Sequence, residues 1–214
     1  MGPRERRDRE RQETRTKIID AAREMFVAEG VEAVTMREIA KRIEYTPTAI
    51  YHHFRDKQAL IRELVEQDFL AFSGAMQKTA RIADPVERLR ASGLAYVDFG
   101  LTHPSHYRAL FLIPELASAK SEVHAAHKGH PGEDAYAYLR QTVADCISAG
   151  RFRTELKDAD AVAQLMWAGV HGVVSLHIVF AEGIGKAIVW RDARRTARLL
   201  IDNAIRGALR EEDE

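Results

Sequence analysis

Helix-start signals in quick succession constrain the first third of this chain more than any other feature. Thr35 and Glu38 form a capping box, in which the hydroxyl accepts the Glu38 backbone N–H and the carboxylate returns to Thr35. Thr46 precedes Pro47, which suits the first helical position because its missing N–H has no partner there. Asp56 caps a further start. These signals lie so close together that the helices between them must be short.

Apolar spacing predicts helices along the rest of the chain, without convincing strand alternation. Residues 12–29 form one amphipathic stripe that ends at Gly30. Further helices are expected at 36–43, 47–53, 57–78 and 85–102, before Pro114, and at 133–149, 158–182 and 191–210, with a loop at 117–132. The predicted fold class is all-α, with about nine helices.

The composition limits the class of protein. With 46% hydrophobic and 30% charged residues among 214, wholesale disorder is excluded. The formal net charge is zero, so the overall charge does not indicate a polyanion partner. A single cysteine, Cys146, excludes an internal disulfide and fits a reducing compartment. The first residues have no apolar stretch, so a signal peptide is not expected and the predicted location is cytoplasmic.

The helix pattern predicts two structural parts. Two short helices joined by about three residues and supported by a longer first helix are typical of a helix-turn-helix. We predict a flexible charged arm at 1–11, an N-terminal three-helix domain at 12–58, a linking helix at 59–80 and a larger helical domain at 81–214.

The helix-turn-helix resembles the DNA-binding domain of the TetR family of bacterial transcription regulators. The resemblance covers about residues 14–65 and depends on Thr35-Met36-Arg37-Glu38-Ile39-Ala40, Ala49-Ile50-Tyr51-His52-His53-Phe54 and Lys57-Gln58-Ala59-Leu60. It implies that the first three helices bind DNA, while the remainder binds a small ligand and forms a homodimer. Residues 167–172, Trp-Ala-Gly-Val-His-Gly, also resemble the Trp-His-Gly signature of one C-terminal subgroup.

One residue departs from the family pattern. Glu44 occupies the turn where the family commonly has Gly, and Glu is less suited than Gly to a positive φ. Either the turn adopts another conformation or the residues shift by one.

Recognition helices present their N-terminal residues to base edges in the major groove. Small side chains there permit close approach, Tyr51 is the strongest single candidate, and basic residues at helix starts can meet phosphate. The predicted DNA-binding residues are Thr35, Arg37, Thr46, Pro47, Thr48, Ala49, Tyr51, His52, His53 and Lys57. Residues 1–17 contain seven basic and four acidic side chains. Two interpretations are open: an N-terminal arm that lies along a DNA groove or phosphate backbone, or a solvated charged tail.

A ligand pocket needs mostly apolar walls with a few polar groups, and the expected ligand is a small apolar or aromatic molecule. The candidate lining residues are Tyr96, Phe99, Tyr107, Phe111, Tyr138, Met166, Trp167 and His171. Aromatic residues at helical spacing fill cores more often than they line sites. His171 fits equally well as a buried histidine satisfied by one hydrogen bond.

The family resemblance implies a dimer built from the last two long helices. The candidate interface residues are Leu176, Phe180, Ala197, Leu200, Ile201 and Ala204, and the alternative is packing within one subunit. Residues 161–181 are uncharged and long enough to cross a membrane, but their polar stripe and small residues favour a buried helix packed on several neighbours.

Metal, cofactor and enzyme interpretations find little support. His124, His127 and His130 are spaced by three, but neighbouring glycine and proline favour a polar loop, so no metal site and no cofactor are predicted. Hydrolase, metalloprotease and dinucleotide motifs are absent from the sequence, which favours a protein that is not an enzyme.

The helix pattern together with the family resemblance implies a ligand-responsive repressor that binds a palindromic operator in double-stranded DNA as a homodimer. The alternative is a helical small-molecule or metal-binding protein in which the helix-turn-helix is only structural.

Overall fold

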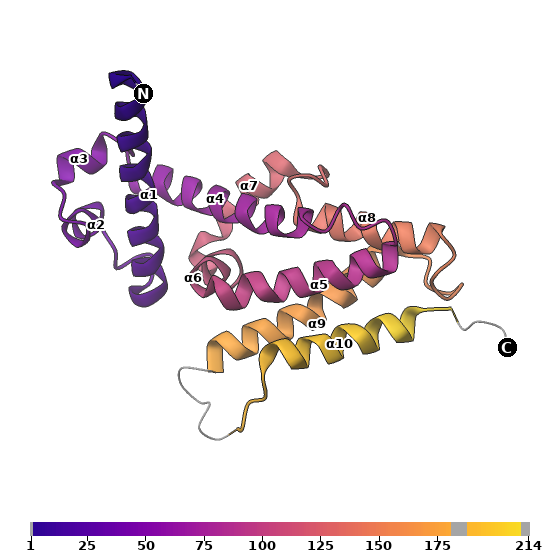
Figure 1. Cartoon of the computed structure of the whole chain (residues 1–214). Helices are drawn as coiled ribbons and strands as arrows, with labels where there is room; N and C mark the ends of the chain where they lie inside the picture. The colour runs from indigo at the N-terminus through magenta and orange to yellow at the C-terminus, as the bar shows by residue number, and fades with distance from the viewer. Residues whose placement is uncertain (1, 181–187, 211–214) are drawn as a thin grey trace. The chain divides into compact units, whose positions relative to one another are not determined.

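A computed structural model describes residues 2–180 and 188–210 (Figure 1). Within these ranges the chain is all-α, with one isolated bridge between Phe152 and Leu209 and no strand. The elements are α1 (Pro3–Glu29), α2 (Met36–Arg42), α3 (Pro47–Tyr51), α4 (Lys57–Gln77), α5 (Pro85–Thr102), α6 (Pro104–Tyr107), the π-helix η1 (Arg108–Leu112), the 3-10 helix η2 (Pro114–Leu116), α7 (Ala117–His127), α8 (Ala135–Ser148), α9 (Ala159–Phe180) and α10 (Ala193–Ala208).

The predicted helix starts are confirmed atom by atom. Glu38 N–H donates to Thr35 Oγ1 at 3.3 Å, and the Glu38 carboxylate accepts the Thr35 N–H at 2.7 Å. Ala49 N–H donates to Thr46 Oγ1 at 3.2 Å, and Ala59 N–H donates to Asp56 Oδ1 at 2.7 Å. Local side-chain chemistry therefore sets where α2, α3 and α4 begin.

The first unit comprises Met1–Phe69 and Ser105–Ala125. Its core is built from the apolar faces of α1 to α4, with Ile18, Phe26 and Ile50 almost fully buried. The later segment fills the same core through Ala109, Leu116, Ala119 and Val123. The predicted domain division placed this segment in the C-terminal domain, whereas its contacts are with the N-terminal helices. The other predicted domain bounds stay predictions.

Two expectations about local structure were wrong. Residues 117–127 form α7 rather than a loop, because the glycine and proline signals all follow His127 and the Ala119 and Val123 side chains pack into the core. With α7, the described residues contain ten α-helices, close to the predicted number of about nine. The predicted arm at 1–11 is helical from Pro3, with the Gly2 N–H donating to the Glu5 carboxylate at 2.7 Å.

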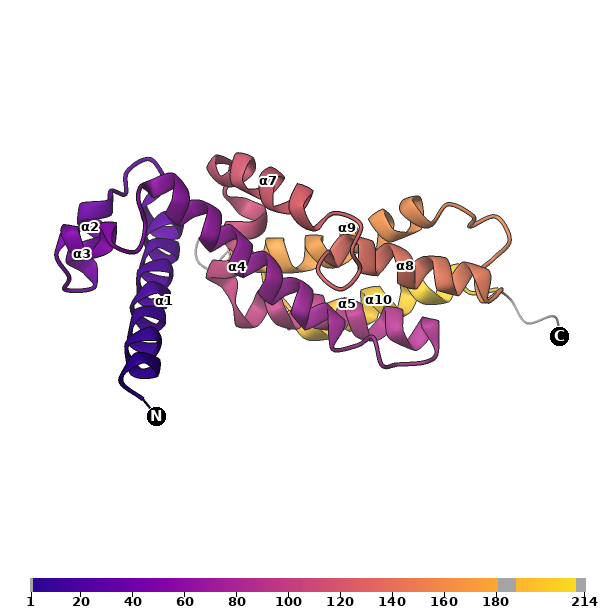
Figure 2. The same cartoon turned by 90° about the horizontal axis from the view of Figure 1, so that it is seen from above.

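The second unit comprises Leu70–Pro104 and Ala126–Glu214. Within it, α5 packs against α8, α9 and α10, and α9 packs against α8 and α10 (Figures 1 and 2). Two glycines permit these close approaches. A Cβ at Gly93 would lie 3.1 Å from Ile201 Cδ1, and one at Gly169 would lie 2.9 Å from Leu200 Cδ2.

Helix α9 is long and apolar enough to cross a membrane by length and composition alone. The expected packing on several neighbours is confirmed, but one side of the helix stays open, with Leu165, Leu176 and Val179 exposed. The predicted end of this helix, at 181–182, lies outside the described residues.

Candidate nucleic-acid interface

The turn between α2 and α3 keeps the left-handed conformation although a glutamate occupies it. Glu44 has φ of 60° and is the one non-glycine residue with positive φ in the described ranges. Tyr45 N–H donates to the Ala40 carbonyl at 2.9 Å, and Glu44 N–H donates to the Lys41 carbonyl at 3.2 Å. These are the two bonds of a Schellman motif. Of the two alternatives, a turn of another conformation is therefore contradicted.

Short helix α3 presents a nearly continuous exposed surface. Thr46, Pro47, Thr48 and His52 are exposed, whereas the Ile50 side chain is fully buried and anchors the helix to the first unit. Tyr51 has half of its surface exposed (50%), although an aromatic ring loses free energy by remaining in water. Such a ring is available to a binding partner.

Residues near α3 are less exposed. Ala49 and His53 are half-buried, and burial, with the nearby charges of Arg11 and Arg15, lowers the pKa of His53, so this imidazole is neutral at pH 7. Thr35 and Arg37 are exposed at the start of α2. Lys57 is turned inward, with its Nζ donating to the Val31 carbonyl at 2.5 Å and lying 5.8 Å from the centre of the Phe26 ring. To bind a phosphate as predicted, Lys57 would have to break its hydrogen bond to the Val31 carbonyl.

Arg15 of α1 holds the end of α3 in place, a contact that the sequence analysis missed. Its guanidinium lies 4.4 Å from the centroid of the Phe54 ring and donates to the His53 carbonyl at 2.8 Å. It also forms a bidentate ion pair with Glu63 of α4. A planar guanidinium suits this combination of stacking and paired hydrogen bonds. Arg15 thus fixes α3 against both α1 and α4.

A second arginine joins α1 to α4 inside the core. Arg23 and Asp68 are 4% and 1% exposed, and the Arg23 Nη2 lies 2.7 Å from Asp68 Oδ1. Arg23 also donates to Asp20 at 2.6 Å, and His106 Nε2 lies 3.8 Å from Asp68 Oδ1. Burial raises the pKa of Asp68 to about 6, although Arg23 opposes the shift. A buried pair of this kind has little tolerance for losing one partner.

The predicted pocket residues divide between the two units. Tyr107 and Phe111 belong to the first, where Tyr107 is fully buried and its ring centroid lies 4.9 Å from that of Phe111. Tyr96, Phe99, Tyr138, Met166, Trp167 and His171 belong to the second.

A polar cluster forms among three of these residues in the second unit. The Tyr96 hydroxyl lies 2.9 Å from His171 Nδ1 and accepts the Trp167 indole N–H at 3.3 Å. Burial lowers the pKa of His171, which favours the neutral ring. Tyr138, in contrast, is buried and hydrogen-bonded to Thr79 at 2.7 Å, as expected of a core residue.

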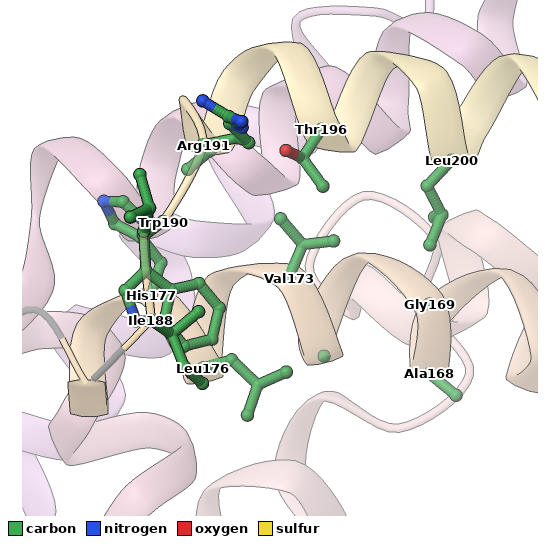
Figure 3. Close-up of a pocket in the computed structure, with 13 residues that line it drawn as sticks. Ala168, Gly169, Val173, Leu176, His177, Ile188, Trp190, Arg191, Thr196 and Leu200 are labelled. Atoms are coloured by element: carbon green, nitrogen blue, oxygen red, sulfur yellow. The ribbon is translucent and has the colours of Figure 1, made fainter. Parts of the chain in front are cut away.

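The second unit contains a different hollow, between α9 and the chain that leads into α10 (Figure 3). Its volume is about 550 Å³. Small residues on α9, Ala168, Gly169 and Gly172, leave space for it, and Trp190 and Arg191 line its other side. None of the predicted pocket residues lines this hollow, whereas the predicted interface residues Leu176 and Leu200 do.

The predicted interface residues do not share one environment. Ala197 and Ile201 are buried within the second unit, where Ile201 packs against α5 at Gly93. Leu176 is exposed, and Leu200 and Ala204 are half-buried. Phe180 stacks on Trp190, with ring centroids 5.7 Å apart.

The histidines at 124, 127 and 130 do not converge. His127 Nδ1 lies 2.8 Å from Glu133, and the His124 ring contacts Phe69 edge-on. Among residues 2–180 and 188–210, no group of three or more His, Cys, Asp or Glu side chains is placed to hold a metal ion.

The fold and the exposed α3 surface define a helix-turn-helix protein with a second helical unit. Residues 18–64 match the family model described as bacterial regulatory proteins, tetR family, and residues 89–203 match that of the tetracyclin repressor-like C-terminal domain. The chain belongs to the TetR family. The matched descriptions do not distinguish the Trp-His-Gly subgroup, and membership of that subgroup stays a prediction.

Individual relatives share parts of the sequence. The HTH-type transcriptional regulator UidR of Escherichia coli strain K12 is 32% identical over 114 residues, 50% of this chain and 53% of that protein. AcrR of Shigella flexneri is 46% identical over 57 residues, 27% of this chain and 26% of that protein. The chain thus spans about half the length of UidR, and a smaller share of AcrR.

Solved structures share the fold. The ketosteroid transcriptional regulator KstR2 of Mycobacterium tuberculosis superposes with a TM-score of 0.70 at 20% identity, covering 92% of this chain and 96% of that one. SmeT, the repressor of a Stenotrophomonas maltophilia multidrug efflux pump, gives a TM-score of 0.68 at 22% identity, covering 92% and 91%.

Proposed function

We propose that this protein is a cytoplasmic transcriptional repressor that binds a palindromic DNA operator as a homodimer and responds to a small ligand. The exposed surface of α3, anchored by Ile50 and clamped by Arg15, is the observation that carries the proposal. A helix pair that only packed would gain from burying Tyr51, which instead remains half exposed. The same surface suits entry into the major groove, with the side chains of 46–49 nearest to the bases.

The homodimer rests on the open side of the second unit. Leu165, Leu176, Val179 and Leu199 are large apolar side chains left exposed on α9 and α10, where a second copy would remove them from water. Two-fold symmetry then requires matched half-sites in the operator. Two recognition helices separated by about 34 Å would enter successive major grooves.

The ligand proposal rests on the second unit. The cluster of Tyr96, Trp167 and His171 places a few polar atoms among aromatic side chains, a composition that suits a small apolar or aromatic molecule. A ligand that favours a dimer of the wrong half-site spacing would release DNA. A hundredfold release requires about 2.7 kcal/mol of coupling between the two sites.

Selection from random duplex DNA, followed by anisotropy titration at two salt concentrations, tests the proposal. We expect the selected sequence to be palindromic and to bind more tightly than a scrambled duplex by roughly a thousandfold or more. Equal binding of both duplexes would contradict it and favour the alternative, a helical binding protein whose helix-turn-helix only packs.

The Tyr51→Ala variant should weaken operator binding by roughly fivefold to 150-fold per half-site, since one good base contact is worth about 1–3 kcal/mol. Tyr51→Phe is the matched control, because it keeps the ring and removes only the hydroxyl. The thermal midpoint should not change in either variant, as the side chain is half exposed. Unchanged operator affinity in Tyr51→Ala would remove this residue from the interface.

A further inference from the structure

The N-terminal half of α1 carries a charged face that the proposed function does not use. This helix begins at Pro3, about three turns before Arg15. In Figures 1 and 2 its N-terminal end projects past α2 and α3. The side chains from Arg4 to Glu13 are exposed, so this part of α1 has no packing role in the first unit.

Three arginines lie along one side of this projecting end. Arg4, Arg7 and Arg11 are spaced by three and four residues, so they share the helix face that Arg15 continues. We call them the arginine stripe. Asp8 is the one acid near that face. In the part of the chain that the structure describes, no ion pair joins a stripe arginine to a carboxylate.

The remaining arginines of this end are neutralised on other sides of the helix. Arg6 lies 3.7 Å from Glu10, and Arg9 lies 3.5 Å from Glu13. Both are pairs of the i, i+4 kind that stabilise an exposed helix. The charge of the helix is therefore uneven around its axis, although its sequence is nearly balanced.

The stripe leads to the end of the recognition helix. Arg15, next along the same face, donates to the His53 carbonyl at 2.8 Å. The positive charge of Arg11 also reaches His53, whose pKa is lowered by burial and by this neighbour. The stripe is therefore continuous along α1 with the residue that holds the end of α3.

We propose that the arginine stripe binds the phosphate backbone of the duplex that α3 reads, beyond the base pairs that α3 contacts. This inference rests on the proposed function. The stripe extends over about 10 Å at 1.5 Å per residue. One strand of B-DNA presents a phosphate about every 3.4 Å of the duplex axis, so a helix face of this length can meet more than one phosphate. Arginine suits this role because its planar fork binds phosphate in two places.

Paired double substitutions test the stripe. Arg7→Gln/Arg11→Gln removes two stripe charges, and Arg6→Gln/Arg9→Gln removes two paired charges from the same turns, so both variants change net charge equally. Affinity for the selected operator and for a scrambled duplex is measured across a salt series. Circular dichroism verifies that both variants keep their helix content.

We expect the stripe variant to reduce the slope of log affinity against log salt by about 1.8 per protomer, since each phosphate contact contributes about 0.9. The control variant should leave the slope unchanged. The reduction should be equal on both duplexes because phosphate contacts do not depend on sequence. Equal slopes for the stripe and control variants would overturn the inference.

The outcomes separate this inference from the proposed function. Wild-type protein that binds both duplexes equally contradicts sequence-selective regulation, while the difference between the two variants still decides the role of the stripe. Wild-type protein that selects the operator with no difference between variants overturns the stripe alone. Protein that binds neither duplex overturns both.

Discussion

The helices inside each unit of this protein are packed through different interactions. In the first, buried or half-buried arginines fix the helices: Arg23 pairs with Asp68 in the core, and Arg15 joins α1 to the end of α3 and to α4. In the second, apolar side chains and glycines let α5, α9 and α10 approach closely. Directional hydrogen bonds hold a surface in one orientation, whereas apolar packing tolerates exchange of side chains of similar volume. The second unit has ion pairs as well, but its Arg88–Asp145 pair is partly exposed, whereas the Arg23–Asp68 pair of the first unit is buried.

The largest expected effect tests the buried pair of the first unit. Asp68→Asn leaves the Arg23 guanidinium buried without its charge partner, and it should lower the free energy of unfolding by about 3–5 kcal/mol. The matched control is Asp98→Asn in the second unit, whose partner Arg194 lies at 2.7 Å but in solvent. That substitution should cost less than about 1 kcal/mol. Urea unfolding measures both, and equal losses would contradict the comparison.

A smaller effect is expected at two left-handed residues, one in each unit. Glu44→Gly should raise the free energy of unfolding by about 0.5–1 kcal/mol, because glycine adopts positive φ without the steric cost that glutamate pays. Gly150→Ala, with φ of 67° and open space around it, should lower that free energy by about 1 kcal/mol. The two variants form a reciprocal pair in thermal or urea unfolding. A loss of stability in Glu44→Gly would indicate that the glutamate side chain contributes there.

The smallest effect concerns pH in the second unit. Burial lowers the pKa of His171 below its ordinary 6.5, so its contribution to stability is present above pH 6.5 and is lost as the pH falls below that value. His171→Gln should therefore narrow the gap between the thermal midpoints at pH 7 and pH 5. His177→Gln, on the same helix, serves as the control. If the difference between the thermal midpoints at pH 7 and pH 5 is the same in His171→Gln as in the wild type, protonation of His171 does not contribute to the pH dependence of stability.

Features set by neighbouring residues could be predicted from the sequence, and features set by distant ones could not. The caps at Thr35, Thr46 and Asp56 follow from side chains that bond to backbone three residues away. Helix α7 was missed because the loop signals come just after it. The resemblance predicted the family correctly because its motifs are local, whereas the contacts of individual residues with DNA stay predictions.

Polar contacts within the first unit lay beyond sequence reasoning. Arg15 and Glu63 are 48 residues apart, and Arg23 and Asp68 are 45 apart, so only the fold brings them together. A weak signal existed, since Arg15 and Arg23 lie on or beside the apolar stripe of α1, where a charged residue needs a partner. The hollow beside α9 was missed because it depends on the volume that small side chains leave empty.

The chain path limits how this protein can be divided. Because Ser105–Ala125 returns to the first unit, the polypeptide passes between the units three times. A fragment cut after Phe69 would lack Leu116, Ala119 and Val123, and the apolar surface they cover would meet water. The first unit therefore cannot be separated from the rest of the protein by a single cut in the chain. A chimaera that joins the first unit to another ligand-binding domain must therefore include both Met1–Phe69 and Ser105–Ala125. The segment Leu70–Pro104, which connects them along the chain, belongs to the second unit.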